Sequence, residues 1–518
     1  MRRLLAVAVA LVAVFGLVLP AMAQAPAAPA PKVTITGTID QIGTYTSNMS
    51  KYDLNYGRGR DDELYGRTRG RFDVVGEIGK AKAVLGIEID AYYGQTSNSD
   101  RNVPAGTTAA SNQGASANGA WDLNTDVAGI IEIKWLYTEF PMFLVPNTIV
   151  RLGAQPFGSA ATYKLAAYAN GDFGGVNWVT TFGPAAALNL TYVQIEEELT
   201  GADFYATSGN AFRGEDWAII ASFDFSPFKG LDIKPMYSYA HFAGLTSGSA
   251  RQGRGGIPNS AAAFRPTDVE ARHTIGVDAR WTAGPFSVAP TVLYQFGNRD
   301  TTIGAAENSA DISAWFFDIR GGFQLGPLTI SAMGMYTSGN KAGDDLTDKV
   351  RFYQPLNTDT SYAADWGTQI FSLGIDYFNI LSFGGSNPGV TIGYDRYGRI
   401  QVGAKVAYAI TPALTLGLAV TPNWTARKVD TSSTLTAGGL TPGDGSGDKQ
   451  YLGTELNLAA TYRFAPGVTF DLAGGYLIAG DALRFSSAHG SAVVPFGGPS
   501  SQDPQDVVLA TARVRFAF

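Results

Sequence analysis

The sequence has no cysteine among its 518 residues, and this absence excludes several kinds of chemistry. Without a thiol the chain cannot form a disulfide, a thiolate metal site, a cysteine nucleophile or a covalent c-type haem, and it cannot carry a lipoprotein anchor. Histidine is nearly as scarce, since His241, His273 and His489 lie far apart and outside HExxH or GxSxG contexts. No phosphate loop or dinucleotide fingerprint follows a strand pattern. We expect no enzyme, no metal ion and no cofactor.

Charged residues are also few, at 16% of the chain, whereas an ordinary soluble domain has roughly 25%. Acidic residues exceed basic ones by 45 to 38, which gives a net charge of −7 and an isoelectric point near 5.2. This balance argues against a nucleic-acid partner, because proteins that bind a phosphate backbone are basic. A mean hydropathy of +0.00 with so few charges indicates that apolar and polar residues alternate along most of the chain.

Long apolar runs are absent after the N-terminus, so no membrane-spanning helix is expected, since one needs about 20 apolar residues. The one apolar run, 4–19, follows the basic start Met1-Arg2-Arg3 and precedes a small-x-small cleavage site at 21–23. This arrangement predicts a secretory signal peptide over 1–23 and an exported protein. Residues 24–32 are rich in Ala and Pro, and we expect a tether there without helix or strand.

Beyond the tether the sequence repeats with a period of two over stretches of about 8 to 14 residues, which is typical of strands with one apolar face. In 269–282, Val277 and Trp281 share one face, while Asp278 and Arg280 share the other. The predicted fold class is all-β. Similar alternation runs through 311–325, 398–410 and 451–464.

The connections between these strands fall into two length classes, short Gly/Pro turns and long polar stretches. Such sorting is typical of transmembrane antiparallel β-barrels, which have short periplasmic turns and long extracellular loops, and not of soluble sandwiches or propellers. We predict one barrel domain over 33–518 with about 18 strands, and with 16 or 20 as alternatives because 367–396 can hold one strand or two. The predicted long connections cover about 46–63, 95–125, 156–172, 197–213, 243–268, 297–310, 338–366, 426–450 and 481–505.

Aromatic residues on the predicted strands suit girdles at the two membrane interfaces, where Trp and Tyr are enriched. Packing against lipid nearer the middle of the bilayer is the alternative for each of them. His273 falls on the outward face of its strand and is also expected at an interface. The aromatic candidates are Trp135, Tyr137, Trp217, Trp281, Trp315 and Tyr462.

The last strand carries a more specific pattern. Val514, Phe516 and the C-terminal Phe518 share an apolar face, and Arg513 and Arg515 lie on the opposite one. In this respect the chain resembles the Gram-negative outer-membrane porins, whose last strand ends in a Phe that the barrel-assembly machinery reads. The resemblance implies an outer-membrane barrel in contact with lipid and lipopolysaccharide, a homotrimer, and a water-filled channel for small hydrophilic solutes and ions.

In a channel the informative residues face the lumen, and basic ones cluster near the predicted closure of the barrel. Three arginines at i, i+2 and i+4 share one strand face, which we expect to point inward beside the small threonines Thr34, Thr36 and Thr38. The alternative is that acids such as Asp73 and Glu88 neutralise them in cross-strand pairs that only stiffen the wall. The predicted basic wall consists of Arg67, Arg69, Arg71, Lys80, Lys82, Arg513 and Arg515.

Porins narrow their pore with the third external loop, which the resemblance places at 156–172. This connection is less Gly/Ser-rich than its neighbours and carries aromatics, as suits a loop packed inside a barrel, although an external position is the alternative. The acidic cluster of the porin family is not evident there, which argues against cation selectivity. The candidate constriction residues are Tyr163, Lys164, Tyr168 and Asp172.

Three functional hypotheses follow from these features. The first is a passive diffusion channel whose arginine wall biases it toward anions. The second is a substrate-specific channel, for instance for a carboxylate or a phosphate. The third is a barrel that sheathes a periplasmic electron-transfer partner, which would have to supply its own cofactor because the chain has no haem motif.

Overall fold

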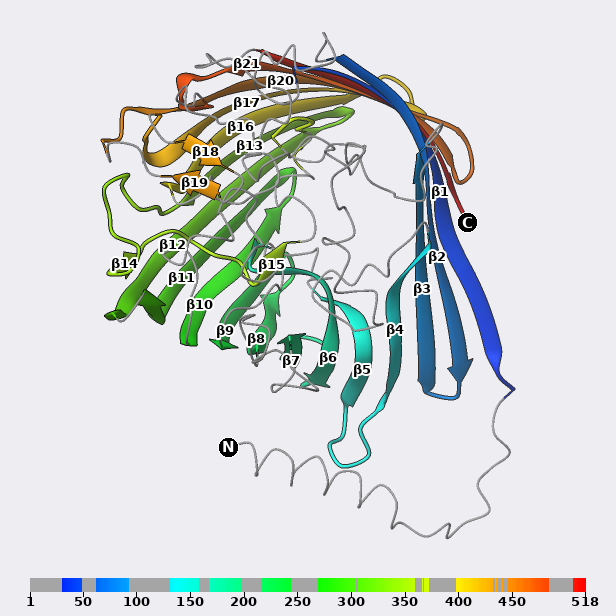
Figure 1. The fold of residues 1–518 in the computed structure, drawn as a ribbon. Coiled ribbons are helices and arrows are strands. Elements are labelled where there is room, and N and C mark those ends of the chain that lie inside the picture. The colour runs from blue at the N-terminus through cyan, green and yellow to red at the C-terminus, as the bar shows by residue number, and fades with distance from the viewer. Residues whose placement is uncertain are drawn as a thin grey trace.

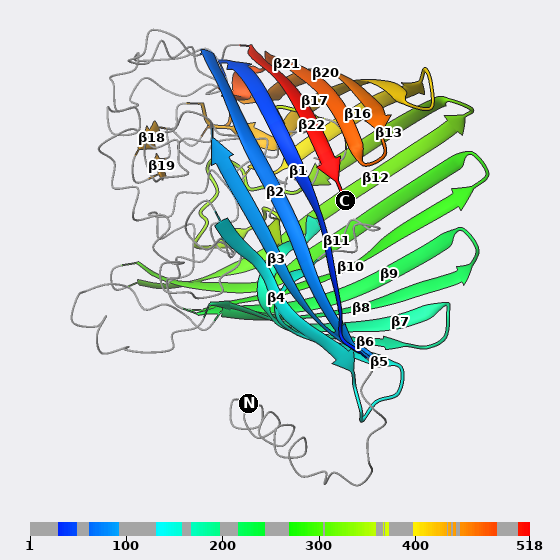
Figure 2. The same ribbon diagram turned by 90° about the vertical axis from the view of Figure 1, so that its right-hand side faces the viewer.

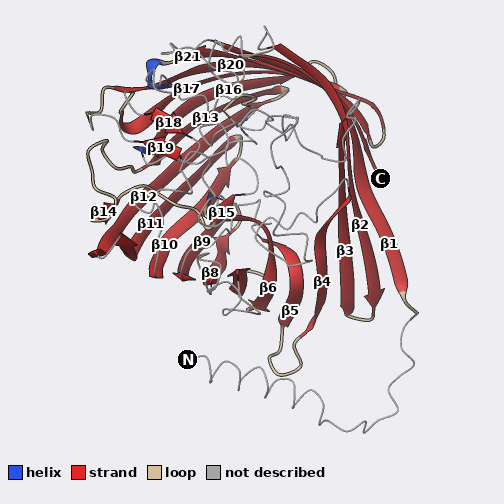
Figure 3. Ribbon diagram, in the orientation of Figure 1, coloured by secondary structure: helices blue, strands red, loops and turns tan. Residues whose placement is uncertain are grey.

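In a computed structural model most of the described residues lie in strands, as Figure 3 shows. No helix in the described part is long and apolar enough to cross a membrane. The predicted signal peptide, 1–23, and most of the tether, 24–32, lie outside the described residues. The structure describes residues 30–48, 62–92, 131–157, 167–196, 216–243, 269–303, 306–358, 366, 368–371, 397–431, 434–436, 439–441, 446–483 and 506–518.

The long strands form one closed antiparallel barrel (Figure 1). Strands β1 to β13 pair in sequence order, β16, β17, β20, β21 and β22 continue the series, and β22 pairs with β1. The first 13 strands and these five make 18, which confirms the predicted number. The barrel strands are β1 (Lys32–Ser47), β2 (Asp62–Ile78), β3 (Ala81–Tyr92), β4 (Ile131–Pro141), β5 (Thr148–Phe157), β6 (Ala169–Thr181), β7 (Ala186–Glu196), β8 (Asp216–Phe228), β9 (Leu231–Ala243), β10 (Val269–Ala283), β11 (Phe286–Ile303), β12 (Ala306–Leu325), β13 (Leu328–Thr337), β16 (Arg399–Ala409), β17 (Leu414–Val429), β20 (Lys449–Ala465), β21 (Val468–Ala479) and β22 (Val507–Ala517).

Hairpin turns gather at one end of the barrel, as Figure 2 shows. The predicted Gly/Pro turns lie there, for example Gly284 and Gly326, which join β10 to β11 and β12 to β13. Both glycines adopt positive φ, 56° and 57°, which a two-residue hairpin turn requires. The turn between β4 and β5 lacks a Gly–Pro pair and was not predicted. Asn147 adopts the positive φ there, at 56°.

The polar composition of 297–310 predicts a long connection, and this prediction is wrong. The β11–β12 ladder continues until Ile303 pairs with Ala306. Arg299 and Asn308 in this region are ladder residues, paired with Ala310 and Thr301. The side chains at these strand ends are polar on both faces, so the sequence there shows no apolar alternation.

Side chains alternate between an apolar outer face and a largely polar inner face. In β10, Ile275 and Trp281 are 50% and 44% exposed on the outside, while Arg272 and Asp278 on the inside are 1% and 0% exposed. Three of the aromatic residues predicted to face outward, Trp281, Trp315 and Tyr462, are exposed. His273 also lies on the outer face, where its ring stacks 4.8 Å from that of Phe296 and Tyr237 hydroxyl lies 2.7 Å from its Nδ1. Trp217 packs between Tyr192, Tyr239 and His241.

Trp135 and Tyr137 depart from the predicted girdle, because both lie on the inner face. The β3–β4 register pairs Gly86 with Trp135 but Ile87 with Ile133, so Lys134 is an extra residue in the ladder. Such a bulge reverses the alternation beyond it. Trp135 consequently lies over Gly86 and donates to Asp172, while Tyr137 is only 9% exposed.

A non-barrel segment lies inside the barrel. We call residues 338–358, 366 and 368–371, the described part of the β13–β16 connection, the inner strap. Tyr353, Leu356 and Trp366 of this strap pack with inward residues of the wall such as Phe316 and Met335. The composition of 338–366 suggested an external loop, which its buried apolar residues contradict. The minor elements are β14 (Lys349–Val350) and β15 (Asn357–Thr358) within the strap, and β18 (Thr434–Thr436), β19 (Gly439–Thr441) and η7 (Asp481–Leu483) elsewhere.

Candidate functional site

The arginines of β2 lie on the inner face of the barrel, next to its closure. Arg69 pairs in register with Asp40 of β1, and Asp40 pairs on its other side with Arg515 of β22. Arg67 is fully buried, whereas the side chain of Arg71 is 44% exposed. Arg69, Arg71 and Arg515, together with Thr36, Thr38 and Trp135, line a cavity of about 460 Å³.

Acids accompany these arginines, so the wall is an array of ion pairs. Glu88 of β3 is 2% exposed and contacts Arg69, Arg71 (Nε to Oε2, 2.8 Å) and Lys134 (Nζ to Oε1, 3.7 Å). This cross-strand pairing agrees with the alternative in which Glu88 neutralises the arginines. The side chain of Asp90 is not among those that the structure describes. Asp73 lines the same cavity, and Glu77 lies 3.8 Å from Lys32.

The arginines of β22 have acidic partners that the sequence did not single out. The guanidinium of Arg515 donates to Asp40 at 2.7 and 2.6 Å, and that of Arg513 donates to Asp471 of β21 at 3.0 and 2.8 Å. Asp40 shares the parity of Thr36 and Thr38, so its inward position could have been read from the strand pattern. These pairs fix the arginines in place and reduce the net positive charge of the wall.

The two predicted lysines have different surroundings. Lys82 of β3 binds Glu139 of β4 at 2.8 Å, and Glu139 also accepts from Arg151 of β5 at 2.9 Å. Lys80 is exposed in the tight turn between β2 and β3 and does not lie on the strand wall. Lys80 therefore does not face the barrel interior as the arginines do, and it is not part of the basic wall.

The predicted constriction loop is only partly within the described residues. Tyr163 and Lys164 lie outside them. Tyr168 is 1% exposed inside the barrel, and its hydroxyl donates to Ser238 of β9 at 2.8 Å. Asp172 belongs to β6 and accepts from Trp135 at 2.7 Å, with Lys134 Nζ at 3.5 Å. Both described candidates thus face the interior, although their contacts are with the wall.

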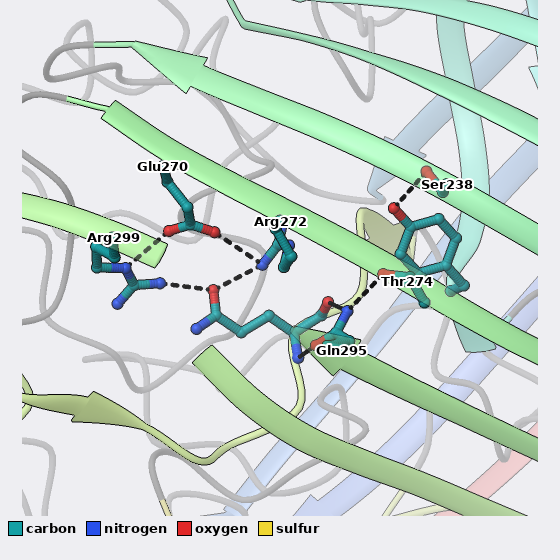
Figure 4. Close-up of polar contacts among 8 residues, drawn as sticks. Ser238, Glu270, Arg272, Thr274, Gln295 and Arg299 are labelled. Carbon is teal, nitrogen blue, oxygen red and sulfur yellow. Dashed lines mark hydrogen bonds and ion pairs between the residues drawn. The ribbon is translucent and has the colours of Figure 1, made fainter. Parts of the chain in front are cut away.

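A second polar cluster lies on the inner face of β10 and β11 (Figure 4). Glu270 contacts both Arg299 (Nε to Oε2, 2.7 Å) and Arg272 (Nη1 to Oε1, 3.4 Å). The two guanidinium groups also donate to the same atom, Oε1 of Gln354 on the inner strap, at 2.8 and 2.9 Å. All three wall residues are at most 2% exposed. The i, i+2 spacing of Glu270 and Arg272 predicts a shared face, but nothing in the sequence linked them to residue 354.

A third polar contact holds the other end of the inner strap. Glu455 of β20 is fully buried and accepts from the backbone N–H groups of Gln369, Ile370 and Phe371. The guanidinium of Arg399 on β16 lies 5.3 Å from the centre of the Phe371 ring. A carboxylate bound by consecutive backbone N–H groups fixes a segment strongly, because hydrogen bonds to an ionised group exceed neutral ones.

The residues of the predicted assembly signal lie on the outer face of β22, at the C-terminal end. Val514, Phe516 and Phe518 are 39%, 45% and 49% exposed. Phe518 exchanges two backbone hydrogen bonds with Gly37 of β1, and its ring lies 6.1 Å from that of Phe72. The C-terminal residue therefore completes the β1–β22 contact.

Comparisons with known proteins give a likeness in fold only. No family model and no curated protein sequence matches the chain. Among solved structures, OccK9 (OpdG) of Pseudomonas aeruginosa is similar with a TM-score of 0.50 at 9% identity, over 94% of this chain and 98% of that one. OccAB4 of Acinetobacter baumannii gives 0.48 at 9% identity, over 94% and 98% of the two chains. The chain is thus a closed 18-stranded antiparallel β-barrel, the architecture that the porin resemblance implied.

Proposed function

We propose that this protein is an outer-membrane porin, a barrel whose water-filled lumen lets small hydrophilic solutes and ions cross a Gram-negative outer membrane by passive diffusion. The observation that carries the proposal is the reversal of ordinary burial: large apolar side chains such as Ile275 and Leu458 face outward at 50% and 66% exposure. Ionic pairs such as Arg513–Asp471 face inward instead. A closed barrel with this polarity satisfies its backbone within lipid and keeps a polar interior.

Several partners belong to the proposal. Lipid and lipopolysaccharide would cover the outer face, and the barrel-assembly machinery would read Val514, Phe516 and Phe518. A homotrimer is the expected assembly of a general porin. The paired arginines at the seam, where β22 and β1 close the barrel, would give at most a mild preference for anions. Glu88 and Asp40 neutralise part of their charge.

Osmotic swelling of proteoliposomes tests the proposal directly. Vesicles that contain the folded full-length protein should swell in isotonic solutions of small sugars, and the rate should fall as the sugar grows, because a pore excludes by diameter. Protein-free vesicles prepared alongside give the baseline. Vesicles that do not swell faster than this baseline would reject the diffusion channel.

A substrate-specific channel is the second candidate, and the inner strap favours it. The strap occupies part of the barrel interior, where Arg272 and Arg299 of the wall donate to its Gln354. Such a channel binds its solute, so ion current should be blocked in a saturable way by one carboxylate or phosphate compound. A block that rises linearly with concentration for all solutes alike would favour the general porin.

A further inference from the structure

The inner strap is bound to the barrel wall through specific polar contacts at residue 354. The side chain of Gln295 on β11 contacts both backbone groups of Gln354, accepting from its N–H at 2.9 Å and donating to its C=O at 2.7 Å. Gln295 thus satisfies the strap backbone in the way a neighbouring strand would. The Gln354 side chain then accepts from Arg272 and Arg299, so that one strap residue makes four hydrogen bonds to the wall (Figure 4).

The second contact is on β20, five strands from β11 in the strand order. Glu455 on β20 accepts from Ile370 N at 2.9 Å and Phe371 N at 2.8 Å, and also from Gln369 N. Because three N–H groups share two carboxylate oxygens, an amide in place of the acid would set one donor against another. The position of 369–371 therefore depends on a side chain at 455 whose two oxygens both accept.

On either side of residue 354 the strap pairs with the inner wall. At one end Lys349 pairs with Asp311 of β12, and at the other Asn357 pairs with Ala169 of β6. The ladders that hold it are short, with two residue pairs each, whereas the barrel itself closes through long ladders that do not include the strap. The barrel can therefore remain closed when the strap moves.

If the strap left the wall, the contacts at 354 and 455 would break, and these contacts join polar groups of the strap to polar groups of the wall. The wall partners Gln295, Arg272 and Glu455 would be solvated in a water-filled lumen, so each lost contact costs only the net value of a hydrogen bond. Apolar contacts of Tyr353, Leu356 and Trp366 also hold the strap to the wall, but such contacts have no direction. The polar contacts at 354 and 455 consequently help to decide where the strap lies, together with the hydrogen bonds from Tyr353 and Leu356 to the backbone of residues 167 and 168.

From this geometry we propose that Gln354 and Glu455 are two latches that hold the inner strap in its place inside the barrel, and that releasing both changes the conducting path. The proposal deepens the proposed function and rests on it. The two residues would set the free cross-section of the channel without touching the strand ladder.

The double variant Gln354→Ala/Glu455→Gln tests the latches. In planar bilayers its single-channel conductance should differ by about twofold from that of the unaltered protein, with steps back to the original level, because conductance follows the free cross-section of a pore. The control variant Gln155→Ala/Asp224→Asn makes the same chemical changes at inner-wall residues that bind only neighbouring strands. It should leave the conductance unchanged. Equal conductance of the latch variant and the unaltered protein would overturn the proposal.

A reversible lock adds a second readout, because the chain has no native cysteine to interfere. Asn357→Cys and Ala169→Cys would bridge the strap to β6, where the residues are paired in register. Paired strands lie about 4.8 Å apart, within the Cα separation of roughly 4.4–6.8 Å that a disulfide spans. In the latch variant the oxidised pair should restore the original conductance, and a reductant should bring back the altered value. An altered conductance that is the same in both redox states would contradict the latch.

Hydrogen exchange separates failure of the latch from failure of the channel. In the folded latch variant the amides of 354, 356 and 369–371 should exchange faster than in the unaltered protein, while the β1–β22 ladder keeps its protection. Unchanged exchange at these amides would overturn the latch proposal even if no channel forms. An unaltered protein that conducts no ions would reject the porin function alone.

Discussion

Ion pairs determine how much of the arginine charge at the seam is open to the lumen. Arg67 is fully buried, Arg69 is 15% exposed through its side chain, and Arg71 is 44% exposed. Arg71 also lies beside Trp135, with its guanidinium 5.7 Å from the ring centre. Among the three arginines predicted to form the basic wall of β2, Arg71 is therefore the one that a passing ion would meet.

Replacing Arg71 by Ala should lower the permeability ratio of anions to cations. One charge about 7 Å from an ion in water contributes about 0.6 kcal/mol, so the ratio should fall by about threefold. Reversal potentials in a salt gradient measure this ratio. Lys229→Ala provides the control, since it removes an exposed charge at the β8–β9 turn. An unchanged ratio in Arg71→Ala would show that Glu88 already cancels the arginine.

At the scale of single elements, β22 is where the two ends of the barrel meet. A Cβ on Gly37 would lie 2.5 Å from the backbone oxygen of Arg71 and 3.3 Å from the Phe518 ring. The glycine therefore leaves the room in which Phe518 and Phe72 pack. Together with the backbone pair between residues 37 and 518, this packing closes the last strand on the first.

Phe518→Ala should weaken this closure by about 1 kcal/mol through the lost aromatic contact and should reduce the fraction of barrels assembled in cells. The readout is the heat-modifiable mobility of the folded barrel in gels. Phe464→Ala is a matched control, because Phe464 is equally exposed on the outer face (53%) but lies in β20, away from the closure. Equal losses in both variants would contradict a special role for the C-terminal residue.

The β10–β11 ladder contains a glycine that the fold requires. Gly297 has a φ of +140°, and a Cβ there would lie 1.9 Å from the carbonyl oxygen of Ala271. Two residues further along the strand is Arg299, which binds the inner strap. The backbone at 297 thus supports the position of that arginine.

Gly297→Ala should lower the free energy of unfolding by about 2 to 3 kcal/mol, because both the dihedral and the contact are unfavourable. Urea unfolding of the barrel in lipid vesicles measures the change. Gly321→Ala serves as the comparison, since the nearest atom to its added Cβ is at 3.8 Å and its φ is ordinary. If the two variants were equally stable, the strain at 297 would be disproved.

The alternation of inward and outward residues along a strand made most strands predictable from the sequence. The predictions failed where this alternation is interrupted or absent. The inward face of β2 and the outward face of β22 follow directly from the period of two. The bulge at Lys134 could not be read, because Ile133, Trp135 and Tyr137 continue an apolar alternation through it. The end of the β11–β12 hairpin was missed because both of its faces are polar.

At the scale of the whole molecule, the closed barrel was predictable from the sequence, but the inner strap within it was not. The alternation of short turns and long connections predicts 18 strands, while Gln354 and Glu455 have no local signal that links them to the wall. Their partners are 55 and 85 residues away for the contacts Gln354–Arg299 and Glu455–Ile370. Only the three-dimensional closure of the barrel brings such residues together.

The central claim is that this barrel encloses a water-filled conducting path. Single-channel recording of the purified, folded, full-length protein in a planar bilayer tests it most directly. The structure predicts discrete, ohmic conductance steps that scale with salt concentration, because ions would move through water and not through a selective binding chain. A bilayer that keeps its baseline resistance after insertion of the folded barrel would contradict the claim.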